Sequence, residues 1–171
     1  MKKAVLRTCL SLIVLRLEMV LLISLLAFSA CSFNTDIFHT FNDIPQRGWD
    51  KRNIQKFIPR LDLSTSKCDI AIEINYNNDY NYRNLYLFIT AEDGSRGILF
   101  KDTLNCVLAD EYGKWLGSGW GSSYQQSFKY KSDYDFPSDG TYYIYVTQGM
   151  RDDVIDGIER VGVKISRAVV K

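Results

Sequence analysis

Few side chains in this chain of 171 residues are suited to catalysis. His39 is the only histidine, so a zinc site of several histidines is excluded, and a serine triad would have to use this one base. Carboxylates gather between Asp133 and Asp139 and between Asp152 and Glu159, in segments that could bind calcium or supply an acid–base pair, but without EF-hand spacing. A structural histidine is the better interpretation of His39, and solvated loop acids explain the carboxylates as well with no added assumption. We therefore expect no enzyme, no metal site and no cofactor.

The cysteines indicate a different chemistry. Basic residues in the first seven positions precede a charge-free stretch, Met19 to Ala30, which is too short to span a bilayer but suits the hydrophobic region of a signal peptide. Small residues directly before Cys31 resemble a lipobox, in which the thiol receives a diacylglycerol before cleavage. Ordinary cleavage after Ser29 is the alternative. The sequence predicts a lipoprotein signal peptide over residues 1–30 and a lipidated Cys31.

Two cysteines, Cys68 and Cys106, remain in the mature part of the chain. In an oxidising compartment an even pair is a candidate disulfide, and closing this loop would contribute ~4 kcal/mol by chain entropy. Two buried free thiols that pack as small apolar side chains are the alternative. A bridge requires a Cβ geometry that the sequence does not supply, so both alternatives stay open.

Aromatic residues are the other suggestive feature, because all three tryptophans and all 11 tyrosines follow Cys31. Gly113 to Gly121 is a glycine-rich stretch with two tryptophans, and exposed rings in such a loop could stack on sugars or anchor a protein. Alternatively, one tryptophan covers the core while glycine permits tight turns. A second candidate contact ends a predicted strand, where Met150 is an adaptable apolar tip. The candidate partner or glycan contacts are Trp115, Trp120, Tyr124, Met150 and Arg151.

Composition describes the part of the chain that must position these residues. Apolar residues make up 46% and charged residues 24%, which is typical of a folded globular protein. After residue 30 there are 17 basic and 19 acidic residues, without the basic excess of a nucleic-acid binder. We expect a short tether over residues 31–35 and a single domain over residues 36–171.

The hydrophobic pattern of that domain predicts strands. Apolar and polar residues alternate from Ile70 to Ile74, and Asn84 to Thr90 is apolar on both faces, as in a central strand. Val154, Ile155 and Ile158 suggest one amphipathic helical turn. The remaining predicted strands are Asp36–Phe41 and Asn53–Ile58 at sheet edges, then Gly97–Lys101, Thr103–Ala109, Gln126–Tyr130, Thr141–Thr147 and Arg160–Ser166. Short strands separated by turn signals indicate an all-β fold, a β-sandwich with jelly-roll or Greek-key connections.

Several segments, in order, resemble a known family. They are Asn84-Leu85-Tyr86-Leu87-Phe88-Ile89, Asp102-Thr103-Leu104, Leu108-Ala109-Asp110, Gly113-Lys114-Trp115-Leu116-Gly117, Phe136-Pro137, Gln148-Gly149-Met150-Arg151, Gly157-Ile158 and Val161-Gly162. Together they resemble the gliding-motility lipoprotein family GldH over Asp36 to Ser166. Cys31 matches the lipidated cysteine of that family.

The resemblance implies an outer-membrane lipoprotein of the gliding apparatus and its linked type IX secretion system, without catalytic residues. Its partners would be the membrane, through an acyl (palmitate) anchor, and other envelope lipoproteins or motility and secretion proteins. No acidic run follows Cys31, which favours the periplasmic face over the cell surface. The alternative is a carbohydrate-binding β-sandwich lipoprotein of the cell envelope, with a glycan as its partner.

Overall fold

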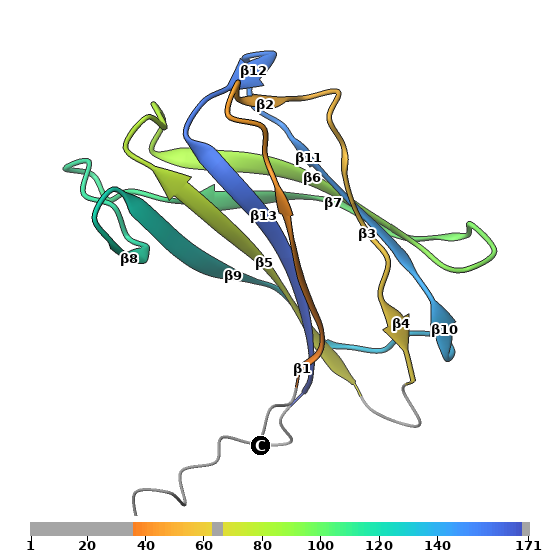
Figure 1. The fold of residues 1–171 in the computed structure, drawn as a ribbon. Coiled ribbons are helices and arrows are strands. Elements are labelled where there is room, and N and C mark those ends of the chain that lie inside the picture. Colours follow the sequence, from red (N-terminus) through yellow and green to blue (C-terminus); the bar gives the residue numbers. More distant parts are fainter. Residues whose placement is uncertain (1–35, 63–66, 169–171) are drawn as a thin grey trace, which may run out of the picture. The chain divides into compact units, whose positions relative to one another are not determined.

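Two antiparallel sheets form the framework of the protein (Figure 1). The computed structural model describes residues 36–62 and 67–168, which lie within the unit Thr35–Lys171. All regular elements in these two ranges are strands, which confirms the predicted all-β class. No helix long and apolar enough to cross a membrane is found in the described ranges. The predicted signal peptide, Cys31 and the tether lie outside the described residues.

The larger sheet has five strands and the smaller has four. In spatial order, the five-stranded sheet contains β1 (Asp36–Asp43), β13 (Ile158–Arg167), β5 (Cys68–Asn77), β9 (Ser123–Tyr134) and β8 (Ser118–Trp120). The four-stranded sheet contains β3 (Gln55–Phe57), β11 (Tyr143–Gln148), β6 (Asn84–Glu92) and β7 (Ile98–Val107). Two short pairs extend the ends, β2 (Trp49–Asp50) with β12 (Val154–Ile155) and β4 (Arg60–Leu61) with β10 (Gly140–Thr141).

The connections are those of a jelly roll. Apart from β8 and the short pairs, eight strands are used, and in chain order they are β1, β3, β5, β6, β7, β9, β11 and β13. The first, eighth, third and sixth of these strands lie side by side in one sheet, and the second, seventh, fourth and fifth in the other. This is the arrangement of two interlocked Greek keys. The sequence left Greek-key and jelly-roll connections open, and the structure has the jelly roll.

The core lies between the sheets because each central strand directs every second side chain inward. On β5 the inward series is Ile70, Ile72 and Ile74, and on β6 it is Leu85, Leu87 and Ile89, all of them fully or almost fully buried. β13, which pairs with β5, directs Val161, Val163 and Ile165 into the same core. The period of two that predicted the strands is therefore also what builds the core.

Two predictions about secondary structure need correction. Gly97–Lys101 and Thr103–Ala109 are not two strands but one, because Asp102 and Thr103 continue β7 in register with β6. The helical turn predicted over Val154–Ile158 is also wrong. Val154 and Ile155 pair with β2, and Gly157, at a positive φ of 77°, turns the chain directly into β13.

The two cysteines of the domain do not form the bridge considered above. Both are buried, and no disulfide joins them. Cys68 begins β5, whereas Cys106 lies close to Tyr80, beyond the other end of that ten-residue strand. Ten strand residues span roughly 30 Å, far more than a disulfide can bridge. Burial raises the pKa of the Cys106 thiol to about 12, so this side chain packs as a neutral apolar group.

Candidate functional site

An aromatic cluster fixes the end of the sandwich where β5 and β9 pair. The Tyr76 ring packs edge-on against Trp115 at 5.2 Å between centroids and stacks on Tyr124 at 5.7 Å. Trp115 donates from Nε1 to Asn78 Oδ1 at 3.0 Å. Trp115 and Tyr124, both predicted as contacts, are half-buried and packed against the core. In the structure they support the loop between β7 and β9, a segment that includes the short strand β8.

That loop is held rigidly. The Tyr76 hydroxyl donates to Leu108 O at 3.1 Å and accepts a bond from Gly117 N at 2.9 Å. A Cβ on Gly117 would lie 2.7 Å from the same hydroxyl oxygen, so only glycine permits this approach. A single antiparallel β-bridge pairs Ala109 with Trp115 and holds the two sides of the loop together. These contacts therefore fix the position of the residues at the tip of the loop.

Large apolar side chains project from this loop into solvent. Trp120 is 96% exposed and Tyr112 is 88% exposed, with Leu116 also open to solvent. The structure thus separates the two predicted tryptophans, because Trp115 packs inward and Trp120 points away. Sequence reasoning missed both Leu116, which belongs to the glycine-rich stretch that identified the tryptophans, and Tyr112, which directly precedes it.

Met150 and Arg151 line a pocket of about 420 Å³ at the end of β11. Tyr82 and Tyr86 form its aromatic side, and the Tyr82 hydroxyl donates to Asp152. The Met150 sulfur accepts a bond from Tyr86 N at 3.4 Å, which ties the loop after β11 to β6. Sequence reasoning found Met150 and Arg151 but missed both tyrosines, which come from another part of the chain.

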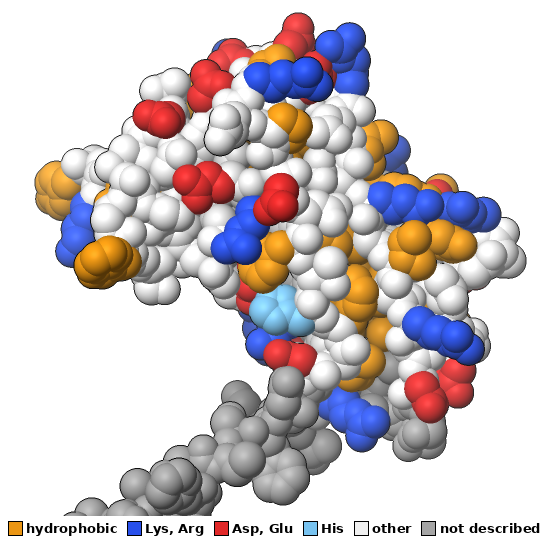
Figure 2. Space-filling model, in the orientation of Figure 1, with side chains coloured by type: hydrophobic (Ala, Val, Ile, Leu, Met, Phe, Trp, Pro, Cys, Tyr) orange, Lys and Arg blue, Asp and Glu red, His pale blue; other side chains and the backbone are white. Residues whose placement is uncertain are grey.

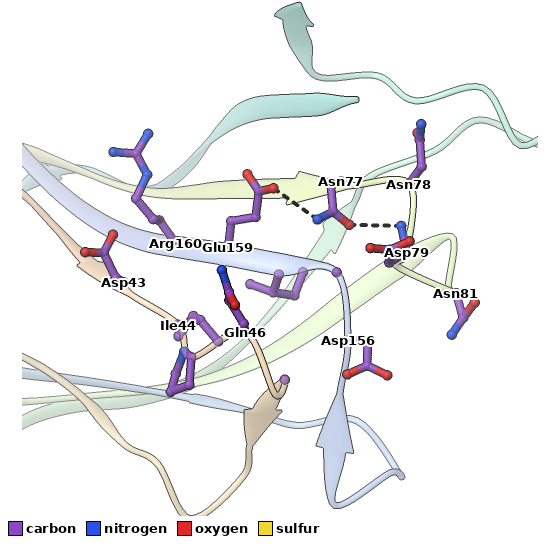
Figure 3. A pocket seen from close by; sticks show the side chains of 14 residues that line it. Asp43, Ile44, Gln46, Asn77, Asn78, Asp79, Asn81, Asp156, Glu159 and Arg160 are labelled. Atoms are coloured by element: carbon purple, nitrogen blue, oxygen red, sulfur yellow. Dashed lines mark hydrogen bonds between the residues drawn. The ribbon is translucent and has the colours of Figure 1, made fainter. Parts of the chain in front are cut away.

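A second hollow, of about 1000 Å³, lies where the loops after β1, β5 and β12 meet (Figure 3). Its charged lining residues are Asp43, Asp79, Asp156, Glu159 and Arg160. Asn77 donates to Glu159 Oε1 at 3.0 Å and accepts from Asp79 N at 2.9 Å, so part of the acidic lining is already bonded within the protein (Figure 3). None of its 14 lining residues is aromatic, so this hollow has no ring on which a sugar could stack.

The chemical candidates lie apart from these surfaces. His39 Nε2 lies 3.0 Å from Glu73 Oε2, and Glu73 is only 5% exposed on the outer face of the five-stranded sheet. Gln125 Nε2 donates to the same carboxylate at 3.3 Å. Within the described ranges no three His, Cys, Asp or Glu side chains are grouped so as to hold a metal ion. The His39–Glu73 pair therefore acts as a structural contact between β1 and β5.

An aromatic side chain also covers part of the outer face of the five-stranded sheet. Phe41 lies over Gly162, where an added Cβ would be 2.7 Å from the ring, and Arg160 stacks on the same ring at 5.1 Å. Lys164 pairs with Asp36 at 3.1 Å. Figure 2 shows basic and acidic side chains next to one another over this face. Its polar groups are mostly satisfied within the chain.

On the outer face of the four-stranded sheet, Tyr86 and Phe88 of β6 are 42% and 48% exposed. The sequence predicted a strand buried on both faces, and that is wrong for this half of its side chains. Lys56 Nζ and Arg96 Cζ lie 4.9 Å and 3.9 Å from the centre of the Tyr143 ring. Aromatic and basic groups therefore occupy this surface together.

What the fold and these surfaces define is a jelly-roll domain with fixed, exposed aromatic side chains at one end and on one face. Comparison with known proteins identifies the family of this domain. The family model described as GldH lipoprotein matches residues 36–165. The chain belongs to the GldH lipoprotein family.

Two relatives extend over most of both chains. A gliding motility lipoprotein GldH homolog from Christiangramia forsetii is 31% identical over 157 residues, covering 87% of this chain and 94% of the relative. The gliding motility lipoprotein GldH of Flavobacterium johnsoniae is 29% identical over 145 residues, covering 79% of this chain and 89% of the relative. These matches confirm the family resemblance found in the sequence.

Among solved structures, the infectious bursal disease virus VP2 subviral particle overlaps with a TM-score of 0.18 and 12% identity. The overlap covers 79% of this chain and 40% of the viral chain. So low a score carries no argument about fold or function.

Proposed function

We propose that this chain is a non-catalytic subunit of the gliding-motility machinery and its linked type IX secretion system, anchored at the periplasmic face of the outer membrane through acylated Cys31. The observation that carries the proposal is the family match over residues 36–165, together with relatives that are named gliding motility lipoproteins. The surfaces support a contact role, because exposed aromatic side chains gather away from the His39–Glu73 pair, of which only Glu73 is buried.

The length of the tether fits this proposal. β1 begins at Asp36, five residues after Cys31. Five extended residues reach at most about 18 Å, so the domain would stay close to the bilayer surface. One acyl chain binds only marginally, whereas the two or three chains of a bacterial lipoprotein anchor stably.

Fatty-acid labelling tests the anchor. The native chain should incorporate labelled palmitate and fractionate with the outer membrane, and Cys31→Ala should lose the label and release the domain in soluble form. Cys9→Ala is the matched control, because this cysteine lies in the segment that cleavage removes, so label and anchoring should persist. Unlabelled native chain, or a Cys31→Ala chain that stays labelled, would refute the anchor.

Deletion and complementation test the role in motility. In a gliding host, loss of the gene should abolish spreading on agar and reduce the proteins secreted into the medium. The native gene should restore both, and the Cys31→Ala variant should restore neither although its domain folds. A deletion strain that spreads and secretes normally would remove the chain from the machinery.

A glycan-binding role is the second candidate, and one observation favours it. Trp120 projects almost fully into solvent from the end of β8, next to the backbone that the Tyr76 hydroxyl holds at Gly117. A ring in such a place can stack on a sugar. Titration with envelope polysaccharide should then quench tryptophan fluorescence in the native chain and not in Trp120→Ala, with Tyr112→Ala as a neighbouring control. No quenching at millimolar sugar would eliminate this role.

A further inference from the structure

One surface of the domain carries side chains that the described part of the chain leaves unmatched, the outer face of the four-stranded sheet. Alternate residues of a strand point to the same side, so Tyr86 and Phe88 of β6 project outward together. Val107 of β7 adds a third exposed apolar side chain at the same end. The Phe88 ring lies against Gly149, since an added Cβ there would be 3.0 Å from the ring. We call these residues the apolar half of the face.

The other half is basic. It contains Lys56 of β3, Arg96 of the turn between β6 and β7, and Lys101 of β7. The described carboxylates at this end are Glu92, which lies 3.1 Å from Arg96, and Asp93, whose Oδ1 accepts bonds from Ser95 and Gly97 within the turn. Lys56 and Lys101 make no ion pair with a described carboxylate. The chain after residue 30 has more acidic than basic residues, so this local excess of positive charge is not a consequence of composition.

The two halves adjoin. Phe88 pairs with Thr103, and Lys101 is the next outward residue along β7. The pocket formed by Tyr82, Tyr86 and Met150 extends the apolar half beyond the end of the strands. A molecule lying along β6 and β7 would therefore meet apolar rings first and the unpaired Lys101 ammonium group next, with Lys56 in the same row at the opposite edge of the sheet.

We propose that this face binds a protein segment that carries an apolar stretch next to a carboxylate-rich stretch. The chemistry is complementary, because exposed aromatic rings serve as anchors of protein interfaces and the cations attract the acidic stretch. The inference rests on the proposed function in one respect only, that a subunit of an assembly needs a contact surface. It does not depend on acylation of Cys31.

Direct contact between β7 and an added strand is not required and is disfavoured. Asp102 points inward from the middle of β7, where it accepts bonds from Tyr130 and Lys131 at 2.6 Å and 2.8 Å. An inward-pointing charge in an edge strand protects that edge from pairing with another chain. The sheet face, rather than the sheet edge, is the docking surface.

The test uses the processed full chain in detergent and two fluorescent synthetic peptides. One has an apolar half, Val-Phe-Val-Thr, and an acidic half, Asp-Glu-Asp-Glu; the other replaces the acids with Asn-Gln-Asn-Gln. We expect the acidic peptide to bind about tenfold more tightly by fluorescence anisotropy. Hydrogen exchange should slow in residues 84–92 and 98–107 when it binds. Equal affinity for the two peptides, or no binding at millimolar peptide, would overturn the proposal.

Variants locate the contact. Phe88→Ser should weaken binding about tenfold and Lys101→Glu about threefold to tenfold, and Lys114→Glu, an exposed cation on the loop between β7 and β9, should have no effect. Vesicles of phosphatidylglycerol provide the competing outcome. If they bind the chain through Lys101 and the acidic peptide does not, the face recognises a lipid surface and the proposal is wrong. Membrane fractionation of Lys101→Glu should stay normal, so failure here is distinguishable from failure of the anchor.

Discussion

The outer faces of the two sheets satisfy their side chains in different ways. On the five-stranded sheet the carboxylate of Glu73 is buried beneath His39 and Gln125, and Phe41 covers Gly162. On the four-stranded sheet the rings of Tyr86 and Phe88 remain open to solvent. Both sheets contribute side chains to one core. The difference teaches that one outer face is covered mainly by its own chain, with Asn75 Oδ1 as a buried exception without a partner among the described residues, whereas the other exposes aromatic rings to a second molecule.

Filling the space under Phe41 should have the largest effect. Valine in place of Gly162 would force the Phe41 ring off the sheet, because the new Cβ would lie 2.7 Å from it. We expect the free energy of unfolding to fall by about 2 to 3 kcal/mol, the upper part of the range for overpacking. Thr103→Val on the other outer face is the control and should stay within about 0.5 kcal/mol in urea denaturation. Equal effects would mean that neither face is more completely packed.

Removing the buried carboxylate should have the next largest effect. Glu73→Ala leaves the donors of His39 and Gln125 without their shared acceptor. The expected loss of unfolding free energy is about 1 to 2 kcal/mol. Glu92→Ala removes a carboxylate that pairs with Arg96 on the other face, and an ion pair of that kind is worth only about 0 to 1 kcal/mol. A larger loss from Glu92→Ala would reverse the comparison.

An acid titration tests the ion pair between Asp102 of β7 and Lys131 of β9, which joins the two sheets. The Lys131 ammonium and the Tyr130 hydroxyl bond to Asp102 and hold the pKa of its carboxyl below the usual value. Because the folded-state pKa lies below the unfolded-state value, this contribution to stability is present above about pH 4 and is lost as the pH falls through the folded-state pKa. Asp102→Asn should therefore flatten the acid limb of a stability–pH curve measured by urea unfolding. An unchanged slope would show that the pair does not join the sheets energetically.

The smallest effect on folding is expected at Lys101. Its side chain is exposed and makes no ion pair with a described carboxylate, so Lys101→Glu should change the free energy of unfolding by less than about 0.5 kcal/mol. Thermal unfolding of the native chain and the variant would measure this directly. A marked loss of stability would show that the basic half supports the fold and is not reserved for a partner.

Much of the fold could be predicted because side chains along a strand point to alternate faces. The alternation of apolar and polar residues therefore indicates both a strand and the side chains that it buries between the sheets. The isoleucines of β5 gave both the strand and its inward face. β6 was harder, since a strand with apolar residues on both sides suggests burial on both, whereas Tyr86 and Phe88 are exposed. The turn at Gly157 was misjudged because a short apolar run fits a helical turn as well as a strand, and only the pairing of Val154 and Ile155 with β2 decides.

Less of the candidate site could be predicted. Spacing alone does not tell which tryptophan of a glycine-rich loop packs inward, because the answer depends on the Tyr76 hydroxyl, 41 residues away from Gly117. The pocket beside Met150 likewise needs Tyr82 and Tyr86 from another strand connection. Long-range pairing brings such residues together, and a single sequence contains no local signal for it.

A photo-crosslinking residue placed on each outer face in living cells is the most direct test of the account. At position 88 on β6 the crosslinker should attach to a discrete protein partner, and Lys101→Glu should reduce that product. At position 127 on β9, an exposed position of the five-stranded sheet that pairs with Glu73, it should give little or none. Equal products from both positions, or a product from position 127 alone, would contradict the claim that only one face is left for a partner.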